Sequence, residues 1–260
     1  MRNRLASQFL PLIEIERCAR DKGISLKEAV RSALAEGAAP ECFRRNAGLI
    51  SLQDQLRLLD LPIFIAGVGG LGGEVAAHLT HLGAANLYLC DYDIFEESNS
   101  NRQRFCDSST LGLQKAAVTA EALSKKIPWG DFKPVFQKLS RDNLPATFKE
   151  CSIVVDCLDS VSGKEKLESM AMEAGIAWLH GSVLDCEGFV CLKSRPDSVL
   201  KSLYGTQTNE SGAGSVLSHI VGGTACAMIA LFMRWLVNPD YSSSLIHLDF
   251  SVPEMEQFSL

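Results

Sequence analysis

A short glycine-rich segment constrains the fold of this chain more than any other feature. The segment IFIAGVGGLGG carries a GxGxxG pattern, and its four relevant glycines are Gly67, Gly69, Gly70 and Gly72. A β-rich run over 63–66 precedes the pattern, and a helical run over 72–82 follows it. Glycines in such a turn let the backbone approach a phosphate, and the N-terminus of the following helix offers unpaired N–H groups. The segment therefore predicts a nucleotide site, without separating NAD from ATP.

From Pro62 onward, short β-rich runs alternate with helical runs, which is typical of βαβ units around a parallel sheet. The predicted strands cover 63–66, 87–91, 135–139, 153–156, 177–180 and 188–192, and the predicted helices cover 72–82, 113–126, 163–174 and 216–236. Residues 195–214 are predicted to be a polar loop, and 245–250 with 256–260 a closing hairpin. The expected fold class is α/β, a Rossmann-like, mainly parallel sheet flanked by helices with an antiparallel C-terminal portion.

The first 40 residues are expected to be a helical extension, and 41–260 a single nucleotide-binding domain. Apolar residues recur at helical spacing between Arg4 and Leu34, with a break near Gly23. A Gly- and Pro-containing link over 37–41 follows, and a further helical pattern ends near Asp60. The sequence does not show whether the extension covers a dimer surface or recruits a partner.

The charge and hydropathy of the chain exclude several classes of protein. A formal net charge of -6 argues against nucleic acid as the main ligand, because binding polyphosphate chains needs clustered Lys and Arg. The N-terminus lacks the uninterrupted apolar run of a signal peptide. The apolar stretch 215–236 is interrupted by His219 and two glycines, which indicates a buried helix rather than a membrane span. We therefore expect a cytoplasmic protein without membrane contact.

The nine cysteines include no CxxC pair, so a four-thiolate zinc site of the usual spacing is not expected. An odd number of cysteines in a cytoplasmic setting also argues against a disulfide framework. We predict that most of them are reduced, buried small hydrophobic residues.

Polar residues after the second predicted strand favour ATP over NAD. Asp91 ends that strand 24 residues after Gly67, where a carboxylate can hold a ribose hydroxyl. Asp93 follows, and then the string SNSNRQ and a lysine, which place Asn99, Arg102 and Lys115 close behind. An NAD site has no need for an arginine and a lysine here, whereas the charge of a triphosphate must be neutralised during attack at the α-phosphorus.

These motifs, taken in order, resemble the ThiF/MoeB/HesA family of ubiquitin-activating-enzyme-like adenylyltransferases over about residues 41–260. The family's glycine loop matches GVGGLGG, and its ribose-binding acid matches Asp91. Its SNxxRQ box matches residues 98–103, its phosphate lysine matches Lys115, and its DxxD segment matches residues 156–159. The resemblance implies that Gly70 and its neighbours approach the phosphates, that Asn99 and Arg102 contact phosphate, and that Lys115 neutralises the triphosphate. It also implies that Asp159 holds Mg²⁺, which prefers few carboxylates together with phosphate oxygens. Asp156 is expected to support this loop or the metal's outer shell, with a strand-end cap as the other interpretation.

The resemblance further implies a homodimer, in which Arg44 or Arg45 reaches the ATP site of the neighbouring subunit. Two adjacent arginines before a helix are also typical of plain surface charge.

The chain departs from the family pattern at its cysteines. The zinc-binding CxxC pairs of many relatives are missing, and the crossover loop has no cysteine between Cys191 and Cys226. A thioester or persulfide at the usual position therefore has no nucleophile. We interpret Cys157, Cys186 and Cys191 as packed structural thiols.

The function expected from the resemblance is ATP-dependent adenylation of the C-terminal Gly-Gly carboxylate of a small ubiquitin-like sulfur-carrier protein, with MgATP as the nucleotide. A second hypothesis, within the same superfamily, is a TcdA-like dehydratase that activates a carboxylate on a modified tRNA base, although the acidic composition argues against it. A third hypothesis is an NAD-binding Rossmann protein, and a fourth is a non-catalytic partner that keeps the fold without turnover. Fold analogy alone does not exclude the non-catalytic partner.

Overall fold

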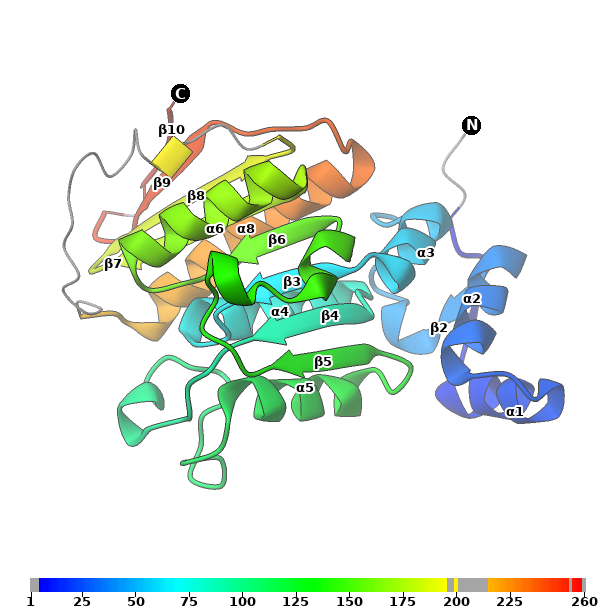
Figure 1. Cartoon of the computed structure of the whole chain (residues 1–260). Coiled ribbons are helices and arrows are strands. Elements are labelled where there is room, and N and C mark those ends of the chain that lie inside the picture. Colours follow the sequence, from blue (N-terminus) through cyan, green and yellow to red (C-terminus); the bar gives the residue numbers. More distant parts are fainter. Residues whose placement is uncertain (1–4, 196–198, 201–214, 253, 259–260) are drawn as a thin grey trace.

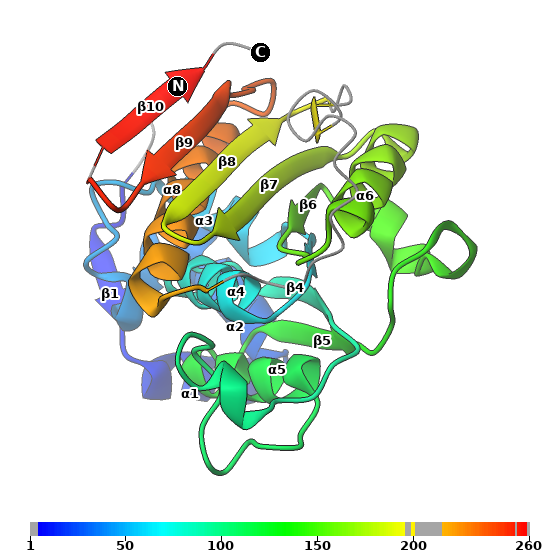
Figure 2. The same ribbon diagram turned by 90° about the vertical axis from the view of Figure 1, so that its left-hand side faces the viewer.

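An eight-stranded sheet runs through the computed structural model, which describes residues 5–195, 199–200, 215–252 and 254–258 (Figure 1). Its strands are β3 (Ile63–Ala66), β4 (Asn86–Cys90), β5 (Asp131–Val135), β6 (Ile153–Asp156), β7 (Ala177–Leu184), β8 (Glu187–Lys193), β9 (Leu245–Asp249) and β10 (Glu254–Phe258). They are arranged in the order β10-β9-β8-β7-β6-β3-β4-β5. The five strands from β7 to β5 are mutually parallel, and β8, β9 and β10 continue the sheet in antiparallel fashion (Figure 2). The predicted α/β fold class, with its mainly parallel sheet and antiparallel C-terminal portion, is confirmed.

Each strand predicted after residue 62 has a counterpart in the structure, and β5 departs most from its predicted bounds. The sequence predicted a strand over 135–139, but pairing with β4 starts earlier, where the Asp131 N–H donates to the Ala85 carbonyl at 2.8 Å. Pro134 then pairs with Leu89 inside β5, which the sheet tolerates because β5 is an edge strand. β7 also runs four residues beyond its predicted end at His180. The predicted polar loop 195–214 lies largely outside the described residues.

Helices cover both faces of the sheet. The α-helices are α1 (Leu12–Lys22), α2 (Leu26–Glu36), α3 (Leu52–Asp60), α4 (Gly70–Leu82), α5 (Lys115–Lys126), α6 (Val161–Ala174) and α8 (Ser218–Val237), and the 3₁₀ helices are η1 (Glu41–Phe43), η2 (Glu97–Asn99), η3 (Arg141–Asn143) and η4 (Ala146–Glu150). Successive strand residues point to opposite faces, so β3 contributes Ile63 and Ile65 to one core and Phe64 to the other. The first core contains α4, α5 and α8, and the second contains α6 and η4.

The two predicted N-terminal helices with a break near Gly23 are confirmed as α1 and α2, but α1 begins at Leu12 instead of near Arg4. Residues Gln8–Leu10 form strand β1, which pairs in parallel with β2 (Ala38–Pro40). Gly37 ends α2 with a positive φ of 102°, a conformation that favours glycine, and turns the chain back toward β1. The core continues from α2 through α3 into the sheet, since Leu34, Leu58 and Ile65 belong to one cluster of buried residues. The division of the chain at residue 40 stays a prediction.

Helix α8 is the one helix among the described residues that is long and apolar enough to cross a membrane. Half of its most apolar window is buried inside the fold, where it packs against α4, β7 and β8. A core helix passes the same test of length and composition, and the packing of α8 is that of a core helix.

The carboxyl ends of β3, β4 and β6 meet at one edge of the sheet (Figure 1). Along the chain, strands are added on one side of β3 as β4 and β5, and then on the other side as β6 and β7. In open α/β sheets, ligands bind at the carboxyl edge where the strand order reverses in this way. The glycine turn follows β3, Asp91 follows β4 and the DCLD segment follows β6, so the topology brings the predicted site residues to the expected place.

The continuity of the core predicts that the N-terminal helices and the sheet unfold together. Replacing the buried Leu34 of α2 with alanine is expected to lower the free energy of unfolding by about 2–5 kcal/mol, in a single transition, because a cavity opens in the shared core. Urea unfolding followed by circular dichroism measures this effect. The control is Ile13→Ala, which removes a side chain that is 64% exposed and should change stability by less than about 0.5 kcal/mol. A separate early transition in Leu34→Ala would show that the two parts unfold independently.

Candidate active site

The glycine turn packs so closely against neighbouring backbone that a residue with a Cβ atom does not fit at Gly67 or Gly72. Gly67 has a φ of +82°, and a Cβ atom on it would lie 2.6 Å from the Cys157 carbonyl oxygen. A Cβ atom on Gly72 would lie 1.8 Å from the carbonyl oxygen of Gly67. Helix α4 begins at Gly70, and its N-cap is Gly69, which supplies no side chain to the first N–H groups. Those N–H groups face the carboxyl edge, as an anion site requires.

Asp91 fastens this turn to the end of β4. Its two carboxylate oxygens accept hydrogen bonds from the N–H groups of Val68 and Asp93, both at 2.9 Å. Burial raises the pKa of Asp91, and these hydrogen bonds and the nearby Lys115 oppose that rise. Asp91 therefore orders the glycine turn directly, and its predicted contact with a ribose stays a prediction.

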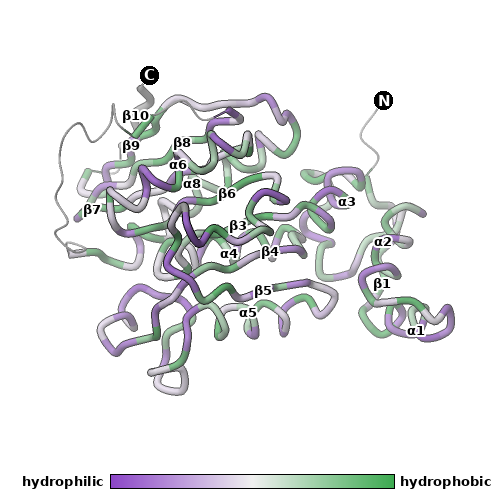
Figure 3. The backbone as a smooth tube through the Cα atoms, in the orientation of Figure 1, coloured by the Kyte–Doolittle hydropathy of each residue, from purple (hydrophilic) through white to green (hydrophobic). Residues whose placement is uncertain are grey.

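The loop after β4 brings Arg102 to the start of α4. The β-position of Gly70 lies 3.5 Å from the Arg102 carbonyl oxygen and 3.7 Å from its Cγ atom. The Arg102 guanidinium donates to the Ser98 carbonyl at 3.0 Å and to the Asn101 side chain at 2.8 Å. No acidic side chain within the described ranges pairs with it. The loop is largely hydrophilic (Figure 3). Because the guanidinium has no acidic partner in these ranges, it can bind an anion beside Gly70.

Asn99 and Gln103 of the same loop are both buried. The Asn99 carboxamide oxygen accepts from the Glu96 N–H at 3.1 Å, so in this structure Asn99 orders the loop. The amide of Gln103 lies against Gly69, and within the described part of the chain its buried oxygen has no hydrogen-bond partner. Gln103 had no predicted role of its own, although the SNxxRQ motif contains it.

Lys115 lies at the first position of α5, where the helix dipole disfavours a cation. Its side chain is 10% exposed, and its ammonium lies 3.4 Å from Asp93. The Lys115 N–H also donates to the Asp93 carbonyl at 3.0 Å. A nearly buried lysine at an unfavourable helix end, beside one carboxylate, can act as a counter-charge for a phosphate at the same edge.

The two aspartates of the DCLD segment have different surroundings. Asp159 is exposed beyond the end of β6. Asp156 is fully buried, and it lies 2.8 Å from His180 Nδ1 and 3.5 Å from the Lys164 ammonium. These partners, Lys164 above all, hold the pKa of Asp156 below its usual range against the opposing effect of burial. Lys164 and His180 were not predicted from sequence, because neither belongs to a recognisable motif.

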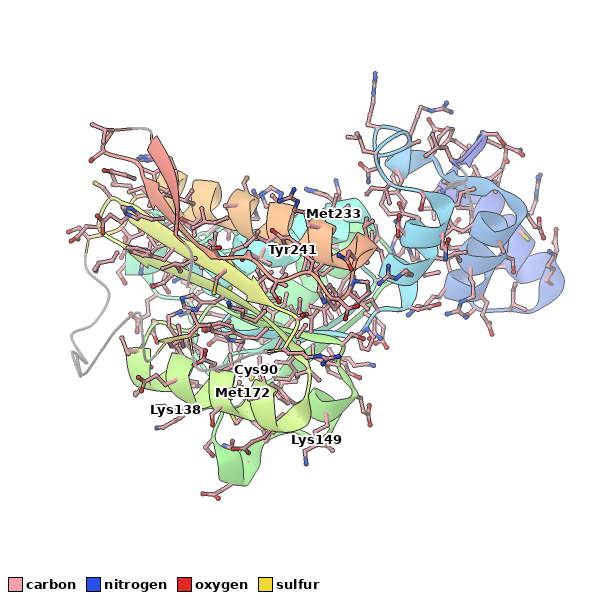
Figure 4. The ribbon with its side chains drawn as sticks, turned by 90° about the horizontal axis from the view of Figure 1, so that it is seen from above. Cys90, Lys138, Lys149, Met172, Met233 and Tyr241 are labelled. Atoms are coloured by element: carbon pink, nitrogen blue, oxygen red, sulfur yellow. The ribbon has the colours of Figure 1, made fainter. Side chains whose placement is uncertain are left out.

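Three carboxylates lie close enough to Tyr92 to act electrostatically on its hydroxyl group. Asp93 contributes most to the raised pKa of Tyr92, followed by partial burial, Asp159 and Asp91. Lys138, which is labelled in Figure 4, belongs to the segment after β5. Its ammonium lies 5.6 Å from the centre of the Tyr92 ring. The structure thus gathers Asp91, Asp93 and Asp159 near one another at the carboxyl edge.

Arg44 does not belong to this group within one chain. Its guanidinium bonds both carboxylate oxygens of Glu41 and lies 4.4 Å from the centre of the Phe9 ring. Helix η1 and its neighbours lie beyond the amino ends of the parallel strands, at the opposite end of the sheet (Figure 1). The predicted entry of Arg44 into a neighbouring subunit stays a prediction.

A magnesium ion fits the donor set at this edge. Among the residues that the structure describes, no three His, Cys, Asp or Glu side chains form a metal-binding group. Mg²⁺ needs no such group, because it binds through one or two carboxylates together with substrate phosphates and water. Asp159 is an exposed carboxylate beside the glycine turn, and it can act as that ligand. The expectation that no zinc is bound stays a prediction.

The fold and this edge define a nucleotide-binding protein of the Rossmann-like α/β class. The sequence model of the ThiF family matches residues 43–256, and the chain belongs to this family. Molybdopterin-synthase adenylyltransferase of Escherichia coli (strain K12) is 28% identical over 238 residues, which cover 87% of this chain and 96% of that protein. Adenylyltransferase and sulfurtransferase MOCS3 of Xenopus laevis is 27% identical over 81% of this chain and 49% of its own length.

Solved structures show the same fold. The chain superimposes on PaaA with a TM-score of 0.66 at 18% identity, covering 79% of this chain and 66% of PaaA. It superimposes on E. coli MccB solved with ATP with a TM-score of 0.65 at 14% identity, covering 79% and 65%.

The contact between Gly72 and Gly67 predicts that Gly72→Ala damages the turn. The added methyl group would meet a backbone carbonyl that cannot rotate away, so we expect a loss of about 1–3 kcal/mol of stability. Gly222→Ala is the matched control, because a Cβ atom there meets nothing within 4 Å, and it should stabilise α8 by up to about 1 kcal/mol. Thermal unfolding compares the two. Equal stability of Gly72→Ala and wild type would contradict the described turn.

His180 predicts a pH dependence of stability. Burial lowers the pKa of His180, with a further contribution from the Lys164 charge, so the folded chain binds a proton there less readily than the unfolded chain, whose histidine titrates at about pH 6.5. This stabilisation is complete above pH 6.5 and is lost as the pH falls, by at most about 1.4 kcal/mol per pH unit. Urea unfolding measures the free energy of unfolding between pH 7.5 and pH 5.5, a range chosen to bracket about 6.5. This free energy should fall less with falling pH in His180→Gln than in wild type. Parallel curves would remove His180 as the source.

Proposed function

We propose that this protein is an adenylyltransferase that uses ATP to activate a carboxylate as an acyl-adenylate. The observation that carries the proposal is the packing of Arg102 against Gly70 at the N-terminus of α4, with Asp91 and Lys115 at the same edge. The adenylyltransferase names of the relatives support this activity, as does the fold shared with MccB, which was solved together with ATP.

The site residues fall into three roles in this proposal. The backbone from Gly69 to Gly72 receives the phosphates at the start of α4, because its N–H groups are free of side-chain caps. Arg102 and Lys115 neutralise the triphosphate from two sides. Asp91 holds the ribose through the remaining lone pairs of its carboxylate, and Asn99 keeps the phosphate-binding loop in place.

The reaction needs positioning and charge stabilisation rather than a general base. A carboxylate oxygen is already anionic, and it attacks the α-phosphorus to form the acyl-adenylate bond. The bond between the α-phosphorus and the bridging oxygen breaks, and pyrophosphate leaves with that electron pair. Arg102 and Lys115 stabilise the charge that builds up on the phosphoryl oxygens. A magnesium ion held by Asp159 would supply further charge neutralisation on the same oxygens.

The acceptor that we propose is the C-terminal Gly-Gly carboxylate of a small ubiquitin-like sulfur-carrier protein. The resemblance of the ordered motifs implies this substrate, and the name of the E. coli relative, a molybdopterin-synthase adenylyltransferase, supports it. A homodimer and a cytoplasmic setting complete the proposal. In such a dimer Arg44 would have to leave Glu41, whereas the adjacent Arg45 is exposed and has no acidic partner in the described ranges.

Nucleotide binding tests the core of this proposal. Arg102→Ala is expected to weaken MgATP binding by about 10- to 100-fold, the equivalent of one charged hydrogen-bonding partner. Calorimetry measures this, with NAD as the competing nucleotide. Arg104→Ala is the matched control, because the neighbouring Arg104 points to Glu74 instead and should leave binding unchanged. NAD binding without ATP binding would overturn the proposal.

The acceptor is tested separately by exchange of labelled pyrophosphate into ATP. Exchange should require a carrier protein that ends in Gly-Gly, and removal of the last glycine should abolish it, because the carboxylate then falls short of the α-phosphorus by about 3.5 Å. Lys115→Ala should reduce exchange by about 100-fold or more. MgATP binding without exchange for any Gly-Gly carrier would retain the nucleotide site and exclude this acceptor.

A further inference from the structure

Strand β7 extends beyond its parallel neighbour β6 at the edge of the sheet that carries the proposed site. Strand β6 ends at Asp156, opposite His180, while β7 continues to Leu184. The Gly181 carbonyl on the β6 side therefore has no strand partner. Lys164 of α6 takes this place, because its ammonium donates to the Gly181 carbonyl oxygen at 2.8 Å.

The same ammonium lies 3.5 Å from Asp156, which contacts His180 at 2.8 Å. The Lys164 side chain is 4% exposed, and those of Asp156 and His180 are fully buried. Removing an ammonium and a carboxylate from water is costly, and well-packed apolar residues in their place often stabilise a fold as much as a buried ion pair does. Stability alone is therefore a weak explanation for this group.

This network anchors both ends of the segment that carries Asp159. At one end, Asp156 accepts a hydrogen bond from the Leu158 N–H at 3.2 Å. At the other end, Ser160 caps α6 by accepting from the Gly163 N–H at 3.3 Å, and the next residue of that helix is Lys164. One lysine thus fixes the end of β6 and the start of α6, with only Cys157–Ser160 between them.

We propose that Lys164 is a positioning residue that aims Asp159 at the metal ion of the bound nucleotide, acting through Asp156. This inference rests on the proposed function for its ligand, and on the chain's own contacts for its geometry. Cys157 extends the effect to the glycine turn, because its carbonyl oxygen packs against Gly67. Loss of Lys164 would release the segment between the two anchors while leaving Arg102 and Lys115 in place.

The first test compares ATP binding with and without Mg²⁺ by calorimetry. In wild type, Mg²⁺ should strengthen ATP binding. Lys164→Met should reduce that gain by about 10-fold or more, as the loss of a residue behind a metal ligand usually does, and Asp159→Asn should do the same. Magnesium-free binding should change by less than about 3-fold in both variants, because the phosphate contacts remain. Lys164→Arg, which keeps the charge and the donor, should restore most of the gain.

Lys166→Met is the matched control, because Lys166 is an exposed lysine of the same helix and should leave the gain intact. Equal loss of magnesium-free and magnesium-dependent binding in Lys164→Met would show a merely structural role and overturn the inference. An unchanged gain would overturn it as well. Should Lys164→Met fail to fold, Lys164→Gln, which keeps a donor without the charge, replaces it with the same expected outcomes.

The second test needs no nucleotide. Hydrogen exchange at the Leu158 and Asp159 amides should be at least about tenfold faster in Lys164→Met than in Lys164→Arg. The two variants are compared under conditions in which their global free energies of unfolding are equal. Equal exchange rates would overturn the inference even if the proposed function holds. If wild type binds no ATP, the proposed function fails, and the exchange rates still decide whether Lys164 orders this segment.

Discussion

The close contact between the glycine turn and the end of β4 is the constraint on which the rest of the site depends. The Asp91 carboxylate accepts a hydrogen bond from the Val68 N–H, and the Gly72 α-carbon packs against the Gly67 carbonyl, so both contacts constrain the turn. That conformation sets where α4 begins, and Arg102 packs on the first residue of α4. A residue predicted to bind a ligand is thus also the residue that shapes the binding surface.

The site was predictable from sequence where its residues belong to local motifs. Gly67, Asp91, Arg102, Lys115 and Asp159 follow strands whose carboxyl ends must meet, so their gathering at one edge follows from the alternation of strands and helices. Lys164 and His180 form no such motif. They become partners of Asp156 only because β7 extends beyond the end of β6 and α6 packs over the end of β6. This arrangement depends on tertiary packing, which a local sequence motif does not reveal.

The fold shows the same division between local and non-local information. The central strands β3 and β6 were predicted at their observed bounds, because continuous apolar runs mark strands buried on both faces. The edge strand β5 was misplaced, and the short strand β1 was not predicted. Their positions depend on partners distant in sequence, Ala85 for Asp131 and the β2 segment for Gln8–Leu10, rather than on their own composition.

Helix α8 covers the start of α4, where Val221 lies 3.5 Å from the β-position of Gly70, and Met228 packs on Gly181 of β7. During synthesis on a ribosome, the glycine turn, Arg102 and Lys164 all emerge long before this helix does. Domains generally fold as units during synthesis. The apolar face of α4 and β7 that α8 covers therefore stays uncovered until α8 has been made. The nascent chain therefore exposes the surface beneath α8 to chaperones and to other nascent chains until α8 itself has left the exit tunnel.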